Sequence, residues 1–552
     1  MPTITINRKE FEKLVGKKLD DDSLKDRISM LGTDLEKIEG NDIVVEIFPN
    51  RPDMLSEQGF ARAFASFIGV KTGLREYKVR KSDYRVIVEP SVKKVRPYTM
   101  CAIVKNLKFD DEKIREIIQL QEKLHVTFCR NRKKAAIGIY PLEKIRLPIY
   151  YRAKKPKDIC FVPLEMDKKL NGLQILGQHP TGREFAHLLE GKDLFPVFED
   201  ADGNVLSMPP IINSHMTGKV CDKTTDVFIE TSGFDMKAQS RLLNIILCSL
   251  ADMGGEIHEM VLEYPDERIV SPEMQPELWD LDLAYINRRL GLELSEPDVK
   301  KLLGKMGFGY SKGRVSVPCY RADIMHQVDF VEDIAIAYGF ESFKEEIPEV
   351  STIAREDIIE IFRRKIAHIL LGLGLLEVNS YHISNKDVQC SRMLLDADVV
   401  ELKNALTSDY NVLRYWIVPN HLEILARNKS YEYPQDIFEI NTVFRKGDTE
   451  TGVREDIRLC VTLCSAEANF TKIKQVLDYL FANLGLVYGI DEVSHPSFIP
   501  GRVGRVSVGN EKIAFIGEMH PQVLQNFSLD YPVAVLELDI TGLFGRVEKN
   551  FY

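Results

Sequence analysis

YRADIMHQVDFVEDIAIAYGF, residues 320–340, is the stretch from which the organisation of the chain can be read. An Arg-x-Asp turn at its start follows a predicted strand over residues 315–319. A helix with an acidic start and an apolar continuation is predicted next. Gly339 marks the end of that helix, because glycine readily adopts the left-handed conformation found after helix C-termini. The stretch therefore predicts a strand–turn–helix unit.

Four carboxylates lie within this stretch. Asp329, Glu332 and Asp333 occupy positions i, i+3 and i+4, so a helix places them on one face. Asp323 precedes them, at the turn that leads into the helix. Convergent carboxylates suit a hard, oxygen-seeking cation, which makes the spacing consistent with a Mg²⁺ site. The alternative is a helix N-terminus whose acids interact favourably with the helix dipole, and such a charged helix face is the commoner case.

The same pattern occurs near the N-terminus, which indicates an internal duplication. Both places have an Arg-x-Asp turn, a later glycine at one fixed interval, and two earlier glycines at equal spacing: Arg51, Asp53, Gly69, Gly16 and Gly32 in one, and Arg321, Asp323, Gly339, Gly291 and Gly307 in the other. Two spacings matched in order predict a duplicated small α/β module. The first copy has Ser56, Glu57 and Phe60 where the second has its acids, which favours a structural docking role for the first copy.

Length, charge and cysteine usage bound the class of protein. The 552 residues exceed a single core, so roughly three to four domains are expected. The net charge of -10 excludes a protein that grips RNA over its whole surface, so any nucleic-acid contact must be local or shared with a partner. The nine cysteines include no CxxC pair, which indicates packing roles in a reducing compartment. No signal core or membrane-length apolar run is found, and a cytoplasmic location is predicted.

The sequence pattern changes along the chain in a way that predicts four domains. These are residues 1–85, the first copy of the module; 86–270, a mixed α/β domain; 271–345, the second copy; and 346–552, where a long amphipathic helix precedes antiparallel strands. The predicted fold class is therefore α+β and multidomain.

Local patterns within these domains add smaller expectations. Residues 200–204 predict a hairpin turn, residues 238–250 a buried helix, and residues 377–382 the start of a strand. One basic cluster is either a solvated loop, the commoner case, or a phosphate contact, and it comprises Arg130, Arg132, Lys133 and Lys134.

Common catalytic motifs are absent from the sequence. It contains no GxxxxGK[ST] loop, no GxGxxG after a predicted strand, no HExxH zinc motif and no GxSxG elbow. Motifs alone therefore describe a soluble multidomain protein of unspecified activity.

Six segments resemble one known family. They are FPNRPDMLSEQGFARA (48–63), VRPYTMCAIVKN (95–106), QEKLHVTFCRNRKKAAIGIY (121–140), MPPIINS (208–214), YRADIMHQVDFVEDIAIAYGF (320–340) and HPSFIPGR (495–502). In these segments and in their order, the chain resembles the beta subunits of phenylalanyl-tRNA synthetases, in the shorter archaeal form.

The resemblance implies a subunit of a ligase. In this family two beta chains pair with two alpha chains, and the alpha subunit carries the site at which ATP and L-phenylalanine react before transfer to tRNA(Phe). The region 346–552 is then expected to be an antiparallel-sheet domain that is similar to class II synthetases but lacks their catalytic motifs. The resemblance therefore implies that no residue of this chain catalyses aminoacylation and that this domain holds the alpha–beta interface.

The resemblance also implies a role for the acidic cluster. The family's magnesium ligands, described as shared with the alpha subunit, fall on Asp323, Asp329, Glu332 and Asp333. An acidic patch that docks a basic alpha surface is the alternative.

The region 86–270 resembles the family's editing domain, which hydrolyses tyrosine wrongly attached to tRNA(Phe). A phenylalanine pocket discriminates weakly against one added hydroxyl, so a second site must recognise that group. The family pattern implies four pocket residues, with the carboxylate accepting a hydrogen bond from the phenol: Phe198, Ser207, Glu230 and Ser232. Ordinary strand polarity is the alternative for both serines.

Two other functions remain open from the sequence. One is a non-catalytic scaffold that docks tRNA or assembles the enzyme and whose editing pocket has decayed. The other is a free-standing metal-dependent hydrolase, which would be active without a partner and would depend on Asp329.

Overall fold

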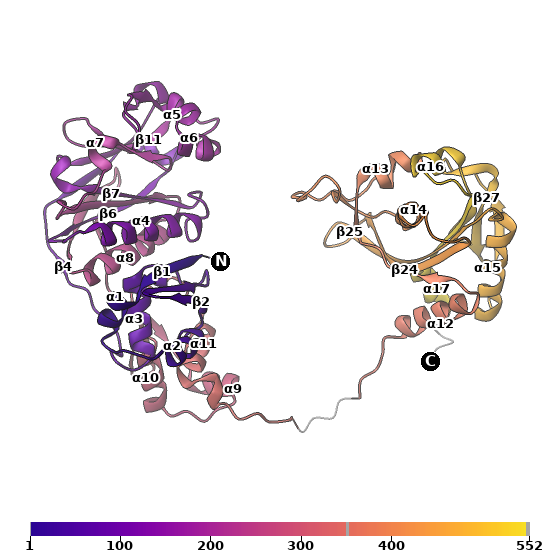
Figure 1. Cartoon of the computed structure of the whole chain (residues 1–552), viewed down its shortest axis with the longest axis horizontal. Coiled ribbons are helices and arrows are strands. Elements are labelled where there is room, and N and C mark those ends of the chain that lie inside the picture. The colour runs from indigo at the N-terminus through magenta and orange to yellow at the C-terminus, as the bar shows by residue number, and fades with distance from the viewer. Residues whose placement is uncertain (1, 349–352, 548–552) are drawn as a thin grey trace. The chain divides into compact units, whose positions relative to one another are not determined.

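The computed structural model describes residues 2–348 and 353–547 of the chain. It is a mixed alpha/beta, multidomain structure with two compact units, Met1–Ile347 and Pro348–Tyr552 (Figure 1). Among the described residues, no helix has the length and apolar character needed to cross a membrane.

Two segments from opposite ends of the first unit share one order of elements. Module A (residues 3–69) contains β1 (Thr3–Asn7), α1 (Arg8–Val15), α2 (Asp21–Met30), β2 (Asp34–Glu39), β3 (Asp42–Glu46) and α3 (Glu57–Phe67). Module B (residues 277–339) contains β18 (Glu277–Asp280), α9 (Leu283–Leu290), α10 (Glu296–Lys305), β19 (Gly309–Ser311), β20 (Arg314–Val317) and α11 (Gln327–Tyr338). Their sheets have matching orders, β1-β3-β2 and β18-β20-β19, and the two modules lie side by side in Figure 1.

The modules also begin and end their helices alike. α1 and α9 each follow a capping side chain, Asn7 and Asp282, that accepts a hydrogen bond from the first turn. Each helix then ends at a glycine with a left-handed backbone, Gly16 with φ 81° and Gly291 with φ 66°. These matched glycines explain the equal spacings in the sequence.

The chain between the modules builds two sheets. The five-stranded sheet has the order β4 (Val79–Arg80), β15 (Glu256–His258), β6 (Tyr98–Lys105), β14 (Val227–Gly233), β7 (Ala135–Pro141). The seven-stranded sheet has the order β13 (Ile212–Asn213), β12 (Val205–Met208), β11 (Phe195–Glu199), β8 (Ile149–Lys154), β5 (Arg85–Val88), β16 (Met260–Glu263), β17 (Arg268–Ser271). A short pair joins β9 (Cys160–Phe161) to β10 (Leu170–Asn171).

Five helices accompany these sheets: α4 (Asp111–Val126), α5 (Gly172–Gln178), α6 (Pro180–Phe185), α7 (His215–Gly218) and α8 (Met236–Asp252). α8 packs on β6 and β14 and also contacts α3, which joins the five-stranded sheet to module A. α8 confirms the helix predicted over 238–250, and the antiparallel pair β11–β12 confirms the hairpin at 200–204.

The second unit is built on one seven-stranded sheet. Its order is β21 (Leu376–Glu377), β24 (Gln435–Lys446), β25 (Val453–Cys464), β29 (Val533–Asp539), β28 (Glu511–Met519), β27 (Phe498–Val508), β26 (Gly489–Glu492), and every pair is antiparallel except β21–β24. β22 (Ile383–Ser384) and β23 (Val412–Leu413) form a separate pair.

Helices pack into two apolar clusters of this unit. α12 (Ile358–Gly372), α15 (Phe470–Leu484) and α17 (Ile540–Val547) contribute to one cluster. α13 (Lys386–Gln389), α14 (Val418–Arg427) and α16 (Pro521–Asn526) contribute to the other.

The strand predicted over 377–382 is wrong beyond its first residue. β21 ends at Glu377, and the chain then leaves the ladder. Ser380 instead donates a side-chain hydrogen bond to Glu439 of β24, and His382 bonds to the side chain of Asn441 on the same strand. Side-chain bonds thus replace the backbone pairing that the sequence pattern predicted.

Candidate functional site

A cavity of about 700 Å³ lies in the first unit between α4, β7 and the loop after β12. Its walls are mainly apolar, with Ile117, Ile137, Ile139 and Ile211 among them. Its polar lining includes Gln121, Ser207, Asn213 and Glu230. A cavity of this size, apolar with a few polar groups, is typical of a small-ligand site.

Glu230 lies in the middle of β14, between β6 and β7, and is buried. The Tyr140 hydroxyl donates a hydrogen bond of 3.1 Å to its Oε1. Gly138 is opposite Glu230 on β7, and a Cβ there would collide with both the Tyr140 hydroxyl and Glu230 Oε1. Glycine at 138 is therefore required to leave room for this pair.

Burial raises the pKa of Glu230 to about 8, and the hydrogen bond from Tyr140 offsets only part of this effect. At neutral pH the carboxyl is therefore mostly protonated. Glu230 Oε2 and Ser207 Oγ are both buried, and neither has a described partner within good hydrogen-bond geometry, although Ser207 lies near the Tyr140 hydroxyl and Ser232 lies near Glu230. Because buried polar atoms are normally paired, these two atoms in one cavity indicate a place for a polar group of a ligand.

Phe198 and Ser232 do not line this cavity. Phe198 on β11 pairs with Ser207 in the ladder and stacks on the Tyr151 ring at 4.3 Å. Ser232 accepts a hydrogen bond of 3.2 Å from Arg96 Nε through its hydroxyl. The structure thus brings Ser207 and Glu230 together and places Phe198 and Ser232 behind them.

A smaller cavity of about 240 Å³ lies next to the first, and Arg132 lines both. Its charged lining is entirely basic: Arg96, Arg132, Lys133 and Lys192. Burial and the nearby Arg96 lower the pKa of Lys192. Arg130, Asn131 and Arg132 adopt left-handed backbones in succession, and this turn carries Arg132 to the carbonyl of Ile211 at 2.8 Å. Of the basic cluster found in the sequence, Arg132 and Lys133 reach this cavity, and Arg96 and Lys192 join them from distant segments.

The four candidate magnesium ligands occupy different settings. Asp323 and Asp333 both bond to the buried Arg321, each with a shortest distance of 2.7 Å. Asp329 accepts hydrogen bonds from the backbone at Met325 and His326, ahead of α11.

Glu332, the fourth candidate, is exposed. Within residues 2–348 and 353–547, the four carboxylates do not form one group of oxygens within 4.8 Å of one another.

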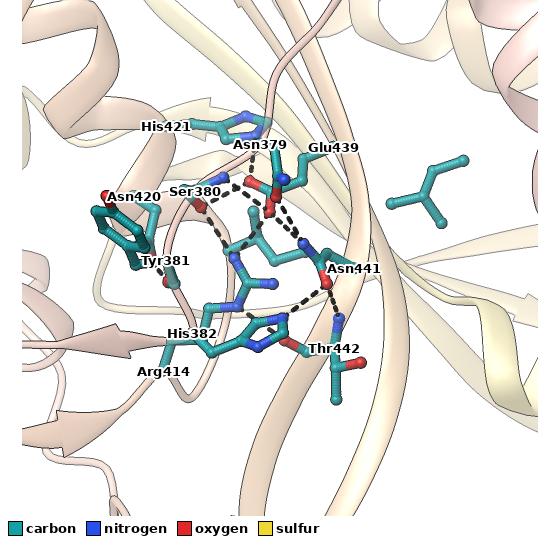
Figure 2. Close-up of polar contacts among 12 residues, drawn as sticks. Asn379, Ser380, Tyr381, His382, Arg414, Asn420, His421, Glu439, Asn441 and Thr442 are labelled. Atoms are coloured by element: carbon teal, nitrogen blue, oxygen red, sulfur yellow. Dashed lines mark hydrogen bonds and ion pairs between the residues drawn. The ribbon is translucent and has the colours of Figure 1, made fainter. Parts of the chain in front are cut away.

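The second unit contains a buried charge network around Arg414 and Glu439 (Figure 2). Both side chains are almost fully buried, with exposed fractions of 0% and 2%, and their closest atoms lie 2.9 Å apart. Ser380 donates to Glu439 at 2.7 Å, and Arg414 Nε donates to the Thr442 carbonyl at 2.7 Å. His421 Nε2 lies 3.6 Å from Glu439.

The network keeps Glu439 ionised. Burial raises its pKa, but the nearby His421 imidazole, the charge of Arg414 and the hydrogen bond from Ser380 outweigh burial and lower the pKa to about 2. This pair ties the loop after β21 to β24, because Ser380 precedes β22 and Glu439 lies within β24. Its partners are internal to the unit, so the network is a structural element of this sheet.

Comparisons with known proteins agree with this architecture. Residues 344–540 match the family model of the "Phenylalanyl tRNA synthetase beta chain CLM domain", and residues 279–340 match the "tRNA synthetase B5 domain". The phenylalanine–tRNA ligase beta subunit of Pyrococcus abyssi is 37% identical over 555 residues, covering 99% of this chain and 100% of the relative. That of Archaeoglobus fulgidus is 37% identical over 556 residues, with the same coverage.

A solved structure matches the first unit. It is an N-terminal fragment of the phenylalanyl-tRNA synthetase beta subunit from Pyrococcus horikoshii, with a TM-score of 0.59 and 37% sequence identity. The match covers 61% of this chain and 99% of the fragment. The identity over nearly the whole length leaves one conclusion: the chain belongs to the family of phenylalanine–tRNA ligase beta subunits.

Proposed function

We propose that this chain acts with an alpha subunit, as an α2β2 assembly, to attach L-phenylalanine to tRNA(Phe) with ATP, and that its own cavity at Glu230 removes tyrosine from mischarged Tyr-tRNA(Phe). The family makes the chain a ligase subunit with an alpha partner. The aminoacylation site is assigned to the alpha subunit. The observation that carries the editing proposal is the pair of unpartnered polar atoms, Glu230 Oε2 and Ser207 Oγ, in an otherwise mainly apolar cavity.

The chemistry of this pair suits a phenol. The mainly apolar walls of the cavity suit an aromatic ring, and the hydroxyl of a phenol can both donate and accept a hydrogen bond. Protonated Glu230 donates from Oε2, and the ionised form accepts there, so the site recognises the phenol in either state. Phenylalanine offers no such group and leaves both protein atoms unpaired, which disfavours its binding.

Water is the proposed nucleophile of the editing step. Its oxygen attacks the ester carbonyl carbon, the bond to the terminal ribose oxygen breaks, and tyrosine and free tRNA result. The chain's contribution is to hold the tyrosyl group in the cavity, while a terminal ribose hydroxyl of the tRNA helps to position the water. The basic cavity at Arg132 and Lys192 adjoins the Glu230 cavity, and its charge suits the phosphates of the tRNA end.

The domain assignments remain part of this proposal. Residues 1–85 form a B1-like module, 86–270 the editing domain, 271–345 the B5-like module and 346–552 the class II-like domain without catalytic motifs. The apolar lining at Glu230 and the family-model match over 279–340 support the second and third assignments.

A Mg²⁺ ion is proposed at Asp323, Asp329, Glu332 and Asp333. The donor type fits a hard cation because all four groups are carboxylates, although their oxygens do not all lie within 4.8 Å of one another in the part of the chain that the structure describes. Arg321 already binds both carboxylate oxygens of Asp323 and one oxygen of Asp333. A cation would therefore share Asp323 with Arg321 and would rely on the other Asp333 oxygen, on Asp329 and Glu332, and on groups of the alpha subunit. The alternative is that the same acids dock a basic surface of the alpha subunit. Metal analysis of the assembled enzyme separates the two, because only the first alternative requires bound Mg²⁺ at these residues.

Hydrolysis of Tyr-tRNA(Phe) by the assembled enzyme tests the editing proposal. E230A removes the hydrogen bond to the phenol, and a loss of about 1.5–3 kcal/mol predicts hydrolysis roughly 10- to 100-fold slower. E230Q keeps a donor and an acceptor, so it should retain most of the activity. Phenylalanine charging should stay unchanged in both variants.

Matched controls exist outside the cavity. E57Q alters another buried glutamate with a raised pKa, and S271A alters a buried serine that, like Ser207, makes no hydrogen bond to described residues. Both controls should hydrolyse Tyr-tRNA(Phe) normally, whereas S207A should be slower. Equal hydrolysis by E230A and the unaltered enzyme would sink the assignment, and no hydrolysis by the unaltered enzyme would favour the scaffold function. Hydrolysis that needs no alpha subunit and is lost in D329A would favour the metal-dependent hydrolase.

A further inference from the structure

A separate cavity of about 440 Å³ lies where module A, module B and the end of α8 meet. Module A contributes α3 and the loop after it, α8 contributes Asp252, and module B contributes Gly307 and Tyr320. The cavity shares no lining residue with the Glu230 cavity. A ligand here would therefore be independent of the editing proposal.

The charged lining of this cavity is almost entirely basic. It contains one acid, Asp252, and five cationic side chains, Lys13, Arg51, Arg62, Lys71 and Arg75. This excess of positive charge occurs in a chain whose net charge is -10. A basic cavity in an acidic protein indicates selection of an anion, because the rest of the surface repels one.

Two of the five cations have acid partners of their own, Lys13 with Glu10 at 3.1 Å and Arg51 with Asp53 at 2.9 Å, but the other three are not balanced. Asp252 lies 2.6 Å from Arg62 and 3.7 Å from Arg75, so one carboxylate serves two guanidinium groups. Lys71 is exposed, and its ammonium donates to the Leu14 carbonyl at 3.2 Å, a contact that does not neutralise its charge. At least one positive charge on this wall is left for a ligand.

Arg62 adds a second, independent sign of a missing partner. Its side chain is 5% exposed and stacks over the Tyr320 ring, with the guanidinium carbon 4.1 Å from the ring centre. Its Nη1 bonds to Asp252, whereas its Nε and Nη2 make no hydrogen bond to any described residue. A buried guanidinium with two unpaired nitrogens is costly, and an acceptor in the adjoining cavity would reduce that cost.

We propose that this cavity binds a phosphate group, with Lys71 and Arg75 as its direct contacts and Arg62 as the buried charge behind them. Guanidinium and ammonium groups together are the usual partners of phosphate oxygens, since the guanidinium fork binds two oxygens and the ammonium acts as a point charge. The volume fits a ligand from pyrophosphate to a mononucleotide in size. The phosphate belongs either to a free small molecule or to an RNA backbone.

Calorimetric titration of the full chain with inorganic pyrophosphate tests this site. K71A/R75A removes the two exposed contacts and leaves the buried Arg62–Asp252 pair intact, so the fold should be preserved. Affinity should fall at least 10-fold. The control K300A/K301A removes the same charge from exposed positions of α10 that do not line the cavity, and its affinity should stay within 2-fold.

A second arm identifies the source of the phosphate. The same variants are titrated with a 12-nucleotide single-stranded RNA at two salt concentrations. Pyrophosphate binding that depends on Lys71 and Arg75 supports a small ligand. RNA binding with that dependence and a reduced salt slope in K71A/R75A, without pyrophosphate binding, supports an RNA phosphate. If K71A/R75A binds both probes as the unaltered chain does, or if neither probe binds the unaltered chain, the site does not exist.

Discussion

Modules A and B share one backbone plan but carry different chemistry at equivalent positions. Counting from the Arg-x-Asp turns, each residue of module A's turn and last helix corresponds to the residue 270 positions later in module B. Four pairs at this interval differ in charge or size, the last of them just beyond the two modules: Glu57 and Gln327, Gly59 and Asp329, Arg62 and Glu332, and Lys71 and Glu341. The basic members, Arg62 and Lys71, line the proposed phosphate cavity, whereas Asp329 and Glu332 belong to the proposed cation site.

The contacts that modules A and B make with each other differ much less than their charges do. A Cβ at Gly32 of module A would lie 3.6 Å from Ile336 of module B, and one at Gly307 of module B would lie 4.0 Å from the Ser66 hydroxyl of module A. Ser66 and Ile336 are themselves equivalent positions. The modules therefore pack reciprocally, as an isologous pair would. The comparison teaches that the positions at which the modules meet keep equivalent contacts, while other positions, buried ones such as Arg62 included, differ in charge.

The largest difference between the modules is expected at the turn arginine. Arg321 binds two carboxylates, Asp323 and Asp333, whereas among the described residues Arg51 forms an ion pair with Asp53 alone. R321A leaves two carboxylates without a partner and should cost about 3–5 kcal/mol, more than R51A. Hydrogen–deuterium exchange of α11 and α3 in the two variants measures this difference. Equal losses would mean that Asp333 contributes nothing to the pairing.

Gly59 marks the next difference. A Cβ at this position would collide with the Asp53 carbonyl, whereas module B places Asp329 at the equivalent position. G59A should therefore destabilise the first unit by about 1–3 kcal/mol. The control G177A introduces a Cβ where nothing lies within 4 Å and should leave thermal stability unchanged or slightly higher. A neutral G59A would show that α3 can shift away from the turn.

Glu57 of module A corresponds to the uncharged Gln327 of module B, so stability should depend on pH at this position of module A. Burial, and then the nearby charge of Glu116, raise its pKa to about 9. Between the ordinary pKa of about 4.5 and this value, the unfolded chain releases a proton that the folded chain keeps, so stability falls as pH rises. E57Q, which introduces the amide that module B has at Gln327, removes this loss, so its stability relative to the unaltered chain should rise by up to about 1.4 kcal/mol per pH unit over this range. Thermal unfolding at pH 5, 7 and 9 checks it; a gain that does not grow with pH contradicts the assignment.

Glu341 and Lys71 should show the smallest change in stability. Glu341 pairs with Arg27 at 3.0 Å in a partly exposed setting, so E341A should cost less than about 1 kcal/mol. K71A should cost no more, yet it should weaken pyrophosphate binding, whereas E341A should not. Thermal shift and titration of both variants compare the two sides. If E341A lost pyrophosphate binding, the anion would depend on the residue beside module B and not on Lys71, which would contradict the proposed site.

The sequence predicts those features that depend on spacing along the chain. The matched glycines and Arg-x-Asp turns predict the shared order of elements in modules A and B, because helix ends and tight turns restrict which residues can occur there. The expected convergence of four carboxylates is not seen, since helical spacing takes no account of Arg321, which binds Asp323 and Asp333. Helical spacing alone does not show that the Arg321 side chain reaches Asp333, which lies 12 residues later in the chain.

The candidate editing cavity was predictable only in part. Glu230 and Ser207 follow from the family resemblance and line the cavity, but Gly138, Tyr140 and Arg96 were missed. Their roles arise from cross-strand neighbours far apart in sequence. A glycine within an otherwise apolar strand, as at Gly138, was the one available signal of a close approach.

The reciprocal packing of modules A and B has a consequence for how the chain is made on the ribosome. Module A is fully translated at Gly69. Its surface for module B has no partner until translation reaches Gly339, the end of module B. At about 5–20 residues per second, that interval is roughly 15–50 s. During this time the nascent chain exposes the face of module A that will later pack on module B. A second nascent chain on the same messenger RNA exposes an identical face. The two sheets inserted between the modules therefore set a kinetic window for mispairing between neighbouring chains.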